Sequence, residues 1–356
     1  MGVSLPRPRM SMITEQHSAL EVQFAGMRLR TPLVTASGTF GYGREYIDKL
    51  TPPNEDRNAW LASLGAITLK SVTLRPREGN PPDRTVETYA GLVNSIGIQN
   101  VGVERLVEEY LPALRELDVR IIVSIAGSTV DEYEQVAEVL ARDLESRPDD
   151  FDAVELNISC PNVKEGGIEF GGTCEGTAAV VRAAARHIRT KPVIAKLTPN
   201  VPNIGEIAIA AVEAGASGLC LINTVSALVL DYRSRRSMIG GLYGGLSGPA
   251  IKPVGLHRVN QAYRALYATG LDVPIVGMGG VSTWEDAIEY VIAGATAVGI
   301  GTALFYNPLV CQQVAAGMTQ FVAAEVDAGR IRRYEDLIGS LETQDGQRLC
   351  PPRRTS

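Results

Sequence analysis

The sequence predicts a single (β/α)8 barrel with insertions at the rim formed by the C-terminal ends of its strands. Short apolar runs rich in β-branched residues recur eight times, and most are followed by a stretch with helical periodicity. No run of hairpins interrupts this alternation. Strands that are apolar along their whole length are typical of a parallel sheet covered on both faces, and eight such units favour a closed barrel. A doubly wound open sheet is the alternative.

The expected elements alternate regularly along the chain. Strands are expected at 32–36, 66–70, 120–125, 153–158, 192–197, 218–222, 273–277 and 297–300, because each is a short and mostly apolar run. Helices are expected at 101–117, 130–145, 177–189, 204–214, 251–268, 283–293 and 308–326, because apolar residues recur there every three or four positions.

The 356 residues exceed the length of an ordinary barrel of about 250 residues. We expect an N-terminal extension over 1–19, the barrel over 20–341 and a disordered tail over 342–356. The intervals 71–119 and 223–271 are too long for one helix, so we expect insertions on the side where barrels build active sites. Residues 51–61 are expected to form a surface insertion.

Composition excludes several classes of protein. The 34 Lys and Arg residues against 40 Asp and Glu residues argue against a nucleic-acid-binding surface. The five cysteines form no close cluster and there are three histidines, so no metal site is expected. The start does not resemble a signal peptide and no apolar run is long enough to span a bilayer. We therefore expect a cytoplasmic protein with no membrane or nucleic-acid partner.

Polar residues and glycine turns gather at the ends of the predicted strands. The strand ends carry Ser37, Lys70, Ser71, Asn157, Cys160, Lys196, Asn223 and Thr224. Polar groups beside buried strands are costly unless they are used, so this rim is a candidate site. The turns Gly279-Gly280 and Gly301-Thr302 follow the seventh and eighth strands, where barrels commonly bind phosphate through backbone N–H groups. We predict a phosphorylated ligand or cofactor there, rather than glycines that only close short loops.

Lys70 and Lys196 admit more than one interpretation. Each is either a structural charge balanced within the barrel or a group that stabilises negative charge developing on an electron-rich flavin or an enolate. A Schiff-base lysine is disfavoured, because the amides and Cys160 would then have no role.

Cys160 differs from the other cysteines in its surroundings. The default for a lone cysteine is a buried, inert thiol, which we expect for Cys220 and Cys311. At Cys160 the next residue, Pro161, ends regular structure, and the glycine-rich segment 163–172 suits a lid that opens and closes. A thiolate there would act as a general base or a nucleophile.

These motifs resemble those of the class 1 dihydroorotate dehydrogenases, FMN-dependent enzymes of pyrimidine biosynthesis. The resemblance covers residues 20–341 and rests on ASGTFGYGRE (36–45), GNPPDRTVET (79–88), NSIGIQN (94–100), LNISCPNVKEGGIEFG (156–171), KLTPNV (196–201), GGLSGPAIKPV (244–254), GMGGV (277–281) and GIGTALF (299–305). ELNISCPN with its following GG and FG is highly specific, whereas other phosphate-binding barrels carry turns like GMGGV. The resemblance implies a barrel with one FMN per chain at the C-terminal ends of the strands.

The resemblance also implies roles for individual residues. The flavin phosphate would lie on Gly279, Gly280, Gly301 and Thr302, with Gly248 close by, and the rest of FMN would contact Ser37, Lys70, Ser71, Asn157, Lys196 and Ile222. Orotate would be held by Lys70, Asn94, Ser95, Ile96, Gly97, Ile98, Asn157, Asn223 and Thr224. Amides and an ammonium group suit a planar ring of carbonyls and N–H groups with one carboxylate. Cys160 matches the catalytic base, which would remove the C5 proton of dihydroorotate while hydride passes from C6 to flavin N5.

Within class 1 the motifs NVKEGG, NSIGIQN, GMGGV and LSGPA resemble class 1B. Class 1B enzymes pair with a second subunit that carries FAD and a 2Fe–2S cluster and passes electrons to NAD+. The resemblance therefore implies a homodimer core within a heterotetramer. One departure is Ser124, where class 1B usually has a flavin-facing asparagine. The shorter hydroxyl does not reproduce the hydrogen bonds of an amide, which argues against a direct contact between Ser124 and FMN.

Three alternatives stay open. The first is a class 1A enzyme, which is a homodimer that uses fumarate. The second is a related FMN barrel that reduces another pyrimidine. A non-catalytic barrel that binds a phosphorylated ligand is disfavoured, because the cysteine, both lysines and the amides are all present. The turn with Arg233, Arg235 and Arg236 is either a solvated loop or a partner contact.

Overall fold

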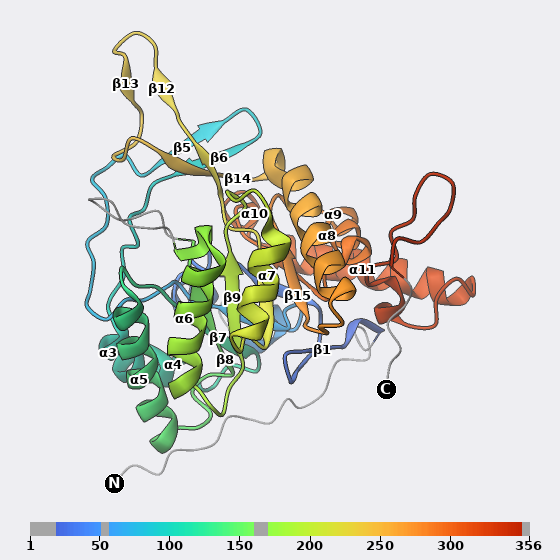
Figure 1. The fold of residues 1–356 in the computed structure, drawn as a ribbon, viewed down its shortest axis with the longest axis horizontal. Helices are drawn as coiled ribbons and strands as arrows, with labels where there is room; N and C mark the ends of the chain where they lie inside the picture. Colours follow the sequence, from blue (N-terminus) through green and yellow to red (C-terminus); the bar gives the residue numbers. More distant parts are fainter. Residues whose placement is uncertain (1–18, 51–56, 160–169, 351–356) are drawn as a thin grey trace.

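The computed structural model describes residues 19–50, 57–159 and 170–350 and contains a closed barrel of parallel strands (Figure 1). In chain order the barrel strands are β3 (Leu33–Thr35), β4 (Ala66–Thr68), β7 (Arg120–Ile125), β8 (Ala153–Asn157), β9 (Val193–Leu197), β10 (Gly218–Leu221), β15 (Ile275–Met278) and β16 (Ala297–Ile300). β16 pairs with β3 and closes the circle. The predicted (β/α)8 barrel is confirmed, and this closure excludes the doubly wound sheet.

Burial explains why these segments are barrel strands. Every residue of β3, β4, β9, β10, β15 and β16 is buried, as expected for strands covered by helices outside and side chains inside. The observed bounds differ from the predicted ones by no more than two residues. Two charged side chains, Glu155 in β8 and Lys196 in β9, are buried among these apolar residues.

Helices cover the outside of the barrel (Figure 1). They are α1 (Arg44–Leu50), α2 (Arg57–Leu61), α3 (Val103–Arg105), α4 (Leu111–Leu114), α5 (Val130–Ser146), α6 (Cys174–His187), α7 (Ile204–Glu213), α8 (Lys252–Ala268), α9 (Trp284–Ala293), α10 (Ala303–Tyr306) and α11 (Val310–Asp327). N-cap side chains explain several starts: Thr129, Thr173, Asn203 and Thr283 each accept a backbone N–H of the first turn. The predicted helix at 101–117 is divided, because π-helical residues Leu106–Tyr110 separate α3 from α4.

A short hairpin closes the N-terminal end of the barrel. It consists of β1 (Val22–Phe24) and β2 (Met27–Leu29), which pair in antiparallel fashion. A Cβ added to Gly218, the first residue of β10, would lie 3.2 Å from the ring of Phe24. The ring of Phe24, which is buried, therefore packs against the start of that strand.

The two predicted insertions meet at the opposite end of the barrel. The first contributes β5 (Thr85–Thr88) and β6 (Gly91–Asn94), and the second contributes β11 (Val225–Ala227) and β14 (Gly244–Ser247). β6 pairs with β14, so the four strands form one sheet in the order β11-β14-β6-β5. This sheet lies over the C-terminal ends of the barrel strands (Figure 1).

A two-stranded arm extends from the second insertion. It contains β12 (Leu230–Asp231) and β13 (Arg236–Ser237) and projects away from the barrel (Figure 1). Leu230, Tyr232 and Met238 are exposed on this arm, beside the basic turn noted in the sequence.

The structure adds detail to two other predicted segments. Residues 342–350, assigned to a disordered tail, form a turn in which Leu349 N donates to Leu341 O, and the Cys350 side chain is buried. In the predicted surface insertion 51–61, residues 57–61 form α2, whose Trp60 is buried and stacks on Phe40. Aromatic packing on the barrel thus orders this half of the insertion. Residues 51–56 and 351–356 lie outside the described residues.

Candidate functional site

A cavity of about 870 Å³ opens at the C-terminal ends of the barrel strands, under the four-stranded sheet. It is lined by all the predicted substrate- and cofactor-binding residues: Ser37, Lys70, Ser71, Asn94, Ser95, Ile96, Gly97, Ile98, Asn157, Lys196, Ile222, Asn223, Thr224, Gly248, Gly279, Gly280, Gly301 and Thr302. Ser124 does not line it. Cys160 and most of the predicted lid lie in 160–169, outside the described residues.

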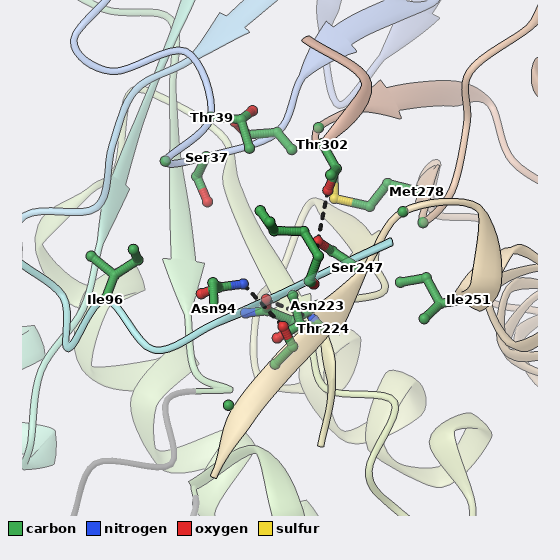
Figure 2. Close-up of a pocket in the computed structure, with 18 of the residues that line it drawn as sticks. Ser37, Thr39, Asn94, Ile96, Asn223, Thr224, Ser247, Ile251, Met278 and Thr302 are labelled. Atoms are coloured by element: carbon green, nitrogen blue, oxygen red, sulfur yellow. Dashed lines mark hydrogen bonds between the residues drawn. The ribbon is translucent and has the colours of Figure 1, made fainter. Parts of the chain in front are cut away.

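The polar residues form two groups within the cavity. Figure 2 shows Asn94, Asn223 and Thr224 close together on one side, and Thr302 joined to Ser247 on the other. Ile251 and Met278 lie beside the second group. The cavity therefore has an amide-rich end and a glycine-rich end.

Asn157 is the centre of the amide-rich end. Its Nδ2 donates to Ser71 Oγ at 3.2 Å, and its Oδ1 accepts from Ser159 Oγ at 3.0 Å and from Asn223 Nδ2 at 3.2 Å. Asn223 Oδ1 in turn accepts from Thr224 N at 2.9 Å. These bonds define which side of each amide is oxygen and which is nitrogen, so the cavity presents a fixed pattern of donors and acceptors.

The loop 94–98 forms another wall of this end. Asn94 Nδ2 donates to Gly245 O at 3.1 Å, which ties the loop to β14. Asn80 donates to Ser95 Oγ at 2.7 Å and fills the space in which a Gly97 side chain would lie, because a Cβ there would be 2.5 Å from Asn80 N. Gly97 has a positive φ of 71°. Glycine is therefore required at this position both for space and for backbone conformation.

Lys70 reaches the cavity from the end of β4. Its backbone N–H donates to Gly41 O at 2.8 Å, and its side chain is only half-buried. Burial lowers the pKa of Lys70, the positive charge of Arg84 lowers it further, and Glu45 opposes both. The cavity thus holds a cation that a bound carboxylate would stabilise.

The glycine-rich end brings three turns together. Gly248, Gly279 and Gly280 have φ values of 93°, 127° and 75°, which favour glycine. A Cβ on Gly280 would lie 2.8 Å from Gly248 O. The Tyr290 hydroxyl donates to Gly279 O at 2.7 Å, so this carbonyl is engaged behind the turn. Backbone groups can therefore approach a ligand closely here, as anion binding requires.

Lys196 lies on the floor of the cavity, and its side chain is 5% exposed. Its Nζ donates to Ser37 Oγ at 2.8 Å and lies 3.9 Å from Glu155 Oε1. Its charge is therefore balanced inside the barrel and its side chain also lines the cavity, and the stabilisation of a flavin or an enolate by this lysine stays a prediction.

Ser124 lies below the cavity floor and is wholly buried. Its hydroxyl is 2.8 Å from Ser71 Oγ and donates to Glu155 Oε1 at 3.0 Å. The side chain is thus engaged within the barrel, and the absence of a direct contact between Ser124 and FMN stays a prediction.

The described cysteines are free thiols away from the cavity wall. Burial raises the pKa of the Cys220 thiol well above its ordinary value and raises the pKa of Cys311 to about 12. Both are buried, as predicted, and are protonated at neutral pH.

Several lining residues were not singled out in the sequence. These residues belong to the quoted family motifs, which could therefore have pointed to them: Thr39, Asn80, Arg84 and Asn200. Arg84 donates to the carbonyls of Glu78 and Asn80 and to the side chain of Gln99, and so braces the loop 94–98. This role of Arg84 could not be predicted from the sequence, because it depends on the pairing of β5 with β6, which brings Gln99 back to Arg84.

The described residues form neither a metal-binding cluster nor a membrane-spanning helix. Across 19–50, 57–159 and 170–350, no group of three or more His, Cys, Asp or Glu residues is placed to hold a metal ion. Within the same described ranges, no helix is both long and apolar enough to cross a membrane.

A closed (β/α)8 barrel with a cavity of this kind at the C-terminal rim is the architecture of the (β/α)8-barrel enzymes, which build their active sites there. A family model described as "Dihydroorotate dehydrogenase" matches residues 19–322. The chain therefore belongs to the dihydroorotate dehydrogenase family, as the motifs predicted.

Curated relatives refine this assignment. The chain is 48% identical to the "Dihydroorotate dehydrogenase B (NAD(+)), catalytic subunit" of Desulforudis audaxviator, over 91% of this chain and 98% of the relative. Proteins of the same name from Desulforamulus reducens and Geotalea uraniireducens are 46% and 44% identical, over 85% and 91% of this chain and 93% and 98% of theirs. The predicted resemblance to class 1B is confirmed.

Proposed function

We propose that this chain oxidises (S)-dihydroorotate to orotate in the synthesis of UMP, as the FMN-containing catalytic subunit of a class 1B enzyme. The observation that carries the proposal is that one continuous cavity joins the glycine turns to the amide-rich end. A phosphorylated cofactor and a small polar ring would then lie against each other in a single pocket.

The glycine-rich end fits the phosphate of FMN. Gly279, Gly280 and Gly248 would bring backbone groups close to the anion, and Thr302 Oγ1, which is 2.7 Å from Ser247 Oγ, would add a hydroxyl. Toward the centre of the cavity, Ile222 and Met278 offer apolar surface for a flavin ring. The donor set and the lack of Cβ atoms at the turns therefore suit this cofactor.

The amide-rich end fits orotate. Asn157, Asn223 and Asn94 would pair with the ring carbonyls and N–H groups, and Lys70 would pair with the carboxylate. Because Asn157 and Asn223 already bond each other, they would meet the ligand with little loss of side-chain freedom.

The chemistry is divided between the cofactor and this chain. Bound FMN supplies the two-electron acceptor for the hydride that leaves C6 of the substrate. Cys160 would take the C5 proton as its thiolate, and Lys196 would hold positive charge beside the flavin. Lys70 and the amides would orient the substrate ring.

The names of the relatives support a partnered enzyme. They are called catalytic subunits and carry NAD(+) in their names. We infer a cytoplasmic homodimer core that joins an electron-transfer subunit with FAD and a 2Fe–2S cluster into a heterotetramer, through which electrons reach NAD+.

The cofactor and the acceptor are tested together on the purified chain, with and without an iron–sulfur flavoprotein partner. We expect a yellow protein that releases FMN on denaturation and reduces NAD+ only with the partner. A flavin-free protein that cannot be reconstituted contradicts the cofactor assignment. Efficient fumarate reduction by the chain alone contradicts the NAD+ assignment and favours class 1A.

A further inference from the structure

A line of polar side chains runs from the cavity floor into the barrel interior. Asn157 Nδ2 is 3.2 Å from Ser71 Oγ, Ser71 Oγ is 2.8 Å from Ser124 Oγ, and Ser124 Oγ is 3.0 Å from Glu155 Oε1. The same carboxylate oxygen is 3.9 Å from Lys196 Nζ. Glu155 lines no part of the cavity, so the substrate and cofactor roles proposed above do not account for it.

The barrel register brings these groups together. Ser124 of β7 is the direct partner of Glu155 in β8, and Asn157 of β8 is the partner of Lys196 in β9. Glu155 and Lys196 are 3% and 4% exposed, so water screens their interaction little. A charge on Glu155 therefore acts on Lys196 more strongly than it would across water.

The direction of each hydrogen bond follows from the carboxylate. An ionised carboxylate only accepts, so Ser124 must use its one proton toward Glu155. Ser71 must then donate to Ser124, and the remaining lone pair of Ser71 accepts from Asn157 Nδ2. Asn157 Oδ1 is left to face Asn223 and Ser159, as the structure has it. Glu155 thus supports, through three hydrogen bonds, the same orientation of the Asn157 amide that Asn223 favours from the other side.

We propose that Glu155 is a positioning residue with two effects on the site. It is the counter-ion that limits the positive charge Lys196 presents to the flavin, and through Ser124 and Ser71 it orients Asn157 for the substrate. Among the described residues the Cys220 thiol also lies near Glu155, and burial raises its pKa, so it is neutral and adds no charge to this pair. The inference rests on the proposed binding of FMN and orotate.

Glu155→Gln tests the first effect, because it removes the charge and keeps the shape and an acceptor for Ser124. Reduction adds negative charge to a flavin, so unopposed Lys196 should favour the reduced form. We expect reduced FMN to gain about tenfold in binding over oxidised FMN, which raises the midpoint potential by about 30 mV in a dithionite titration. Asp150→Asn is the matched control, since Asp150 is a buried carboxylate paired with Arg115 outside the cavity.

Ser124→Ala tests the second effect, because it breaks the line and leaves both charges in place. We expect about tenfold weaker orotate binding, measured by perturbation of the flavin spectrum, with a potential close to that of the unmodified protein. Ser124→Thr keeps the hydroxyl and should restore orotate binding.

Each outcome bears on a distinct claim. An unchanged potential in folded, FMN-containing Glu155→Gln contradicts the counter-ion effect, and so does an equal shift in Asp150→Asn. If Glu155→Gln does not fold, Ser124→Ala decides, and unchanged orotate affinity in that variant contradicts the proposal. Failure of the unmodified chain to bind FMN would instead contradict the proposed function.

Discussion

Asn157 is the residue on which the amide-rich end of the site depends. It accepts from Ser159 and Asn223 and donates to Ser71, so its amide cannot rotate without losing three hydrogen bonds. The sequence placed Asn157 at a strand end, but its orientation depends on Ser71, which is 86 residues away.

Cys160 carries the central chemical assignment at the residue scale. Cys160→Ser should keep FMN and lose about 100-fold or more of dihydroorotate oxidation at neutral pH, because a serine hydroxyl is a far weaker base than a thiolate. Stopped-flow reduction of the bound flavin measures this step directly. Cys220→Ser, a buried thiol outside the cavity, is the control, and equal losses in both variants would contradict the assignment.

The lowered pKa of Lys70 predicts a pH dependence of ligand binding. Burial destabilises the ammonium form, so the charge is lost as pH rises through a value below the ordinary 10.5. The dissociation constant for orotate should therefore increase at alkaline pH. Lys70→Gln should bind orotate about tenfold more weakly at neutral pH and lack this component of the profile.

The comparison of the two proteins isolates Lys70 from titration of the ligand itself. When the pH profile of the orotate dissociation constant for Lys70→Gln is subtracted from that of the unmodified protein, a single step below pH 10.5 should remain. A step at or above that value would show that Lys70 is not desolvated in the site.

At the scale of elements, the four-stranded sheet is what closes the cavity over the barrel. This sheet could not be predicted from the sequence, because two of its strands lack the apolar pattern that marks a strand. β5 alternates exposed and half-buried residues, and β14 begins with two glycines, so neither has the apolar pattern of a strand. β5 pairs with its neighbour β6, and β14 pairs with β6 across 151 residues, as in the Asn94–Gly245 contact.

Gly280→Ala tests the glycine-rich end as an element. The new Cβ would lie 2.8 Å from Gly248 O, so the two turns must separate. We expect FMN affinity to fall about tenfold or more, measured by fluorescence of the released flavin. Gly270→Ala is a matched control, because Gly270 has a similar φ of 73° with nothing within 4 Å. Both variants should lose about 1 kcal/mol of stability from the backbone conformation.

The control separates strain from ligand binding. Equal FMN affinity in the two alanine variants would contradict the placement of the phosphate at this turn. Loss of affinity in Gly280→Ala alone supports it.

For the whole molecule, the barrel could be predicted because its signal is local. Each of the eight short apolar runs, and each helix between them, can be predicted from its own residues. Their order along the chain is also their order in the barrel. Contacts that depend on the register between strands could not be predicted from the sequence. Ser124 is the clearest case, since its partners Ser71 and Glu155 follow from the pairing of β7 with its neighbours.

The most direct test of the account is anaerobic addition of dihydroorotate to the purified, FMN-loaded chain while the visible flavin band is recorded. The account predicts rapid bleaching with about one dihydroorotate per flavin and formation of an equal amount of orotate. A chain that holds FMN but keeps its full colour in excess dihydroorotate would contradict it.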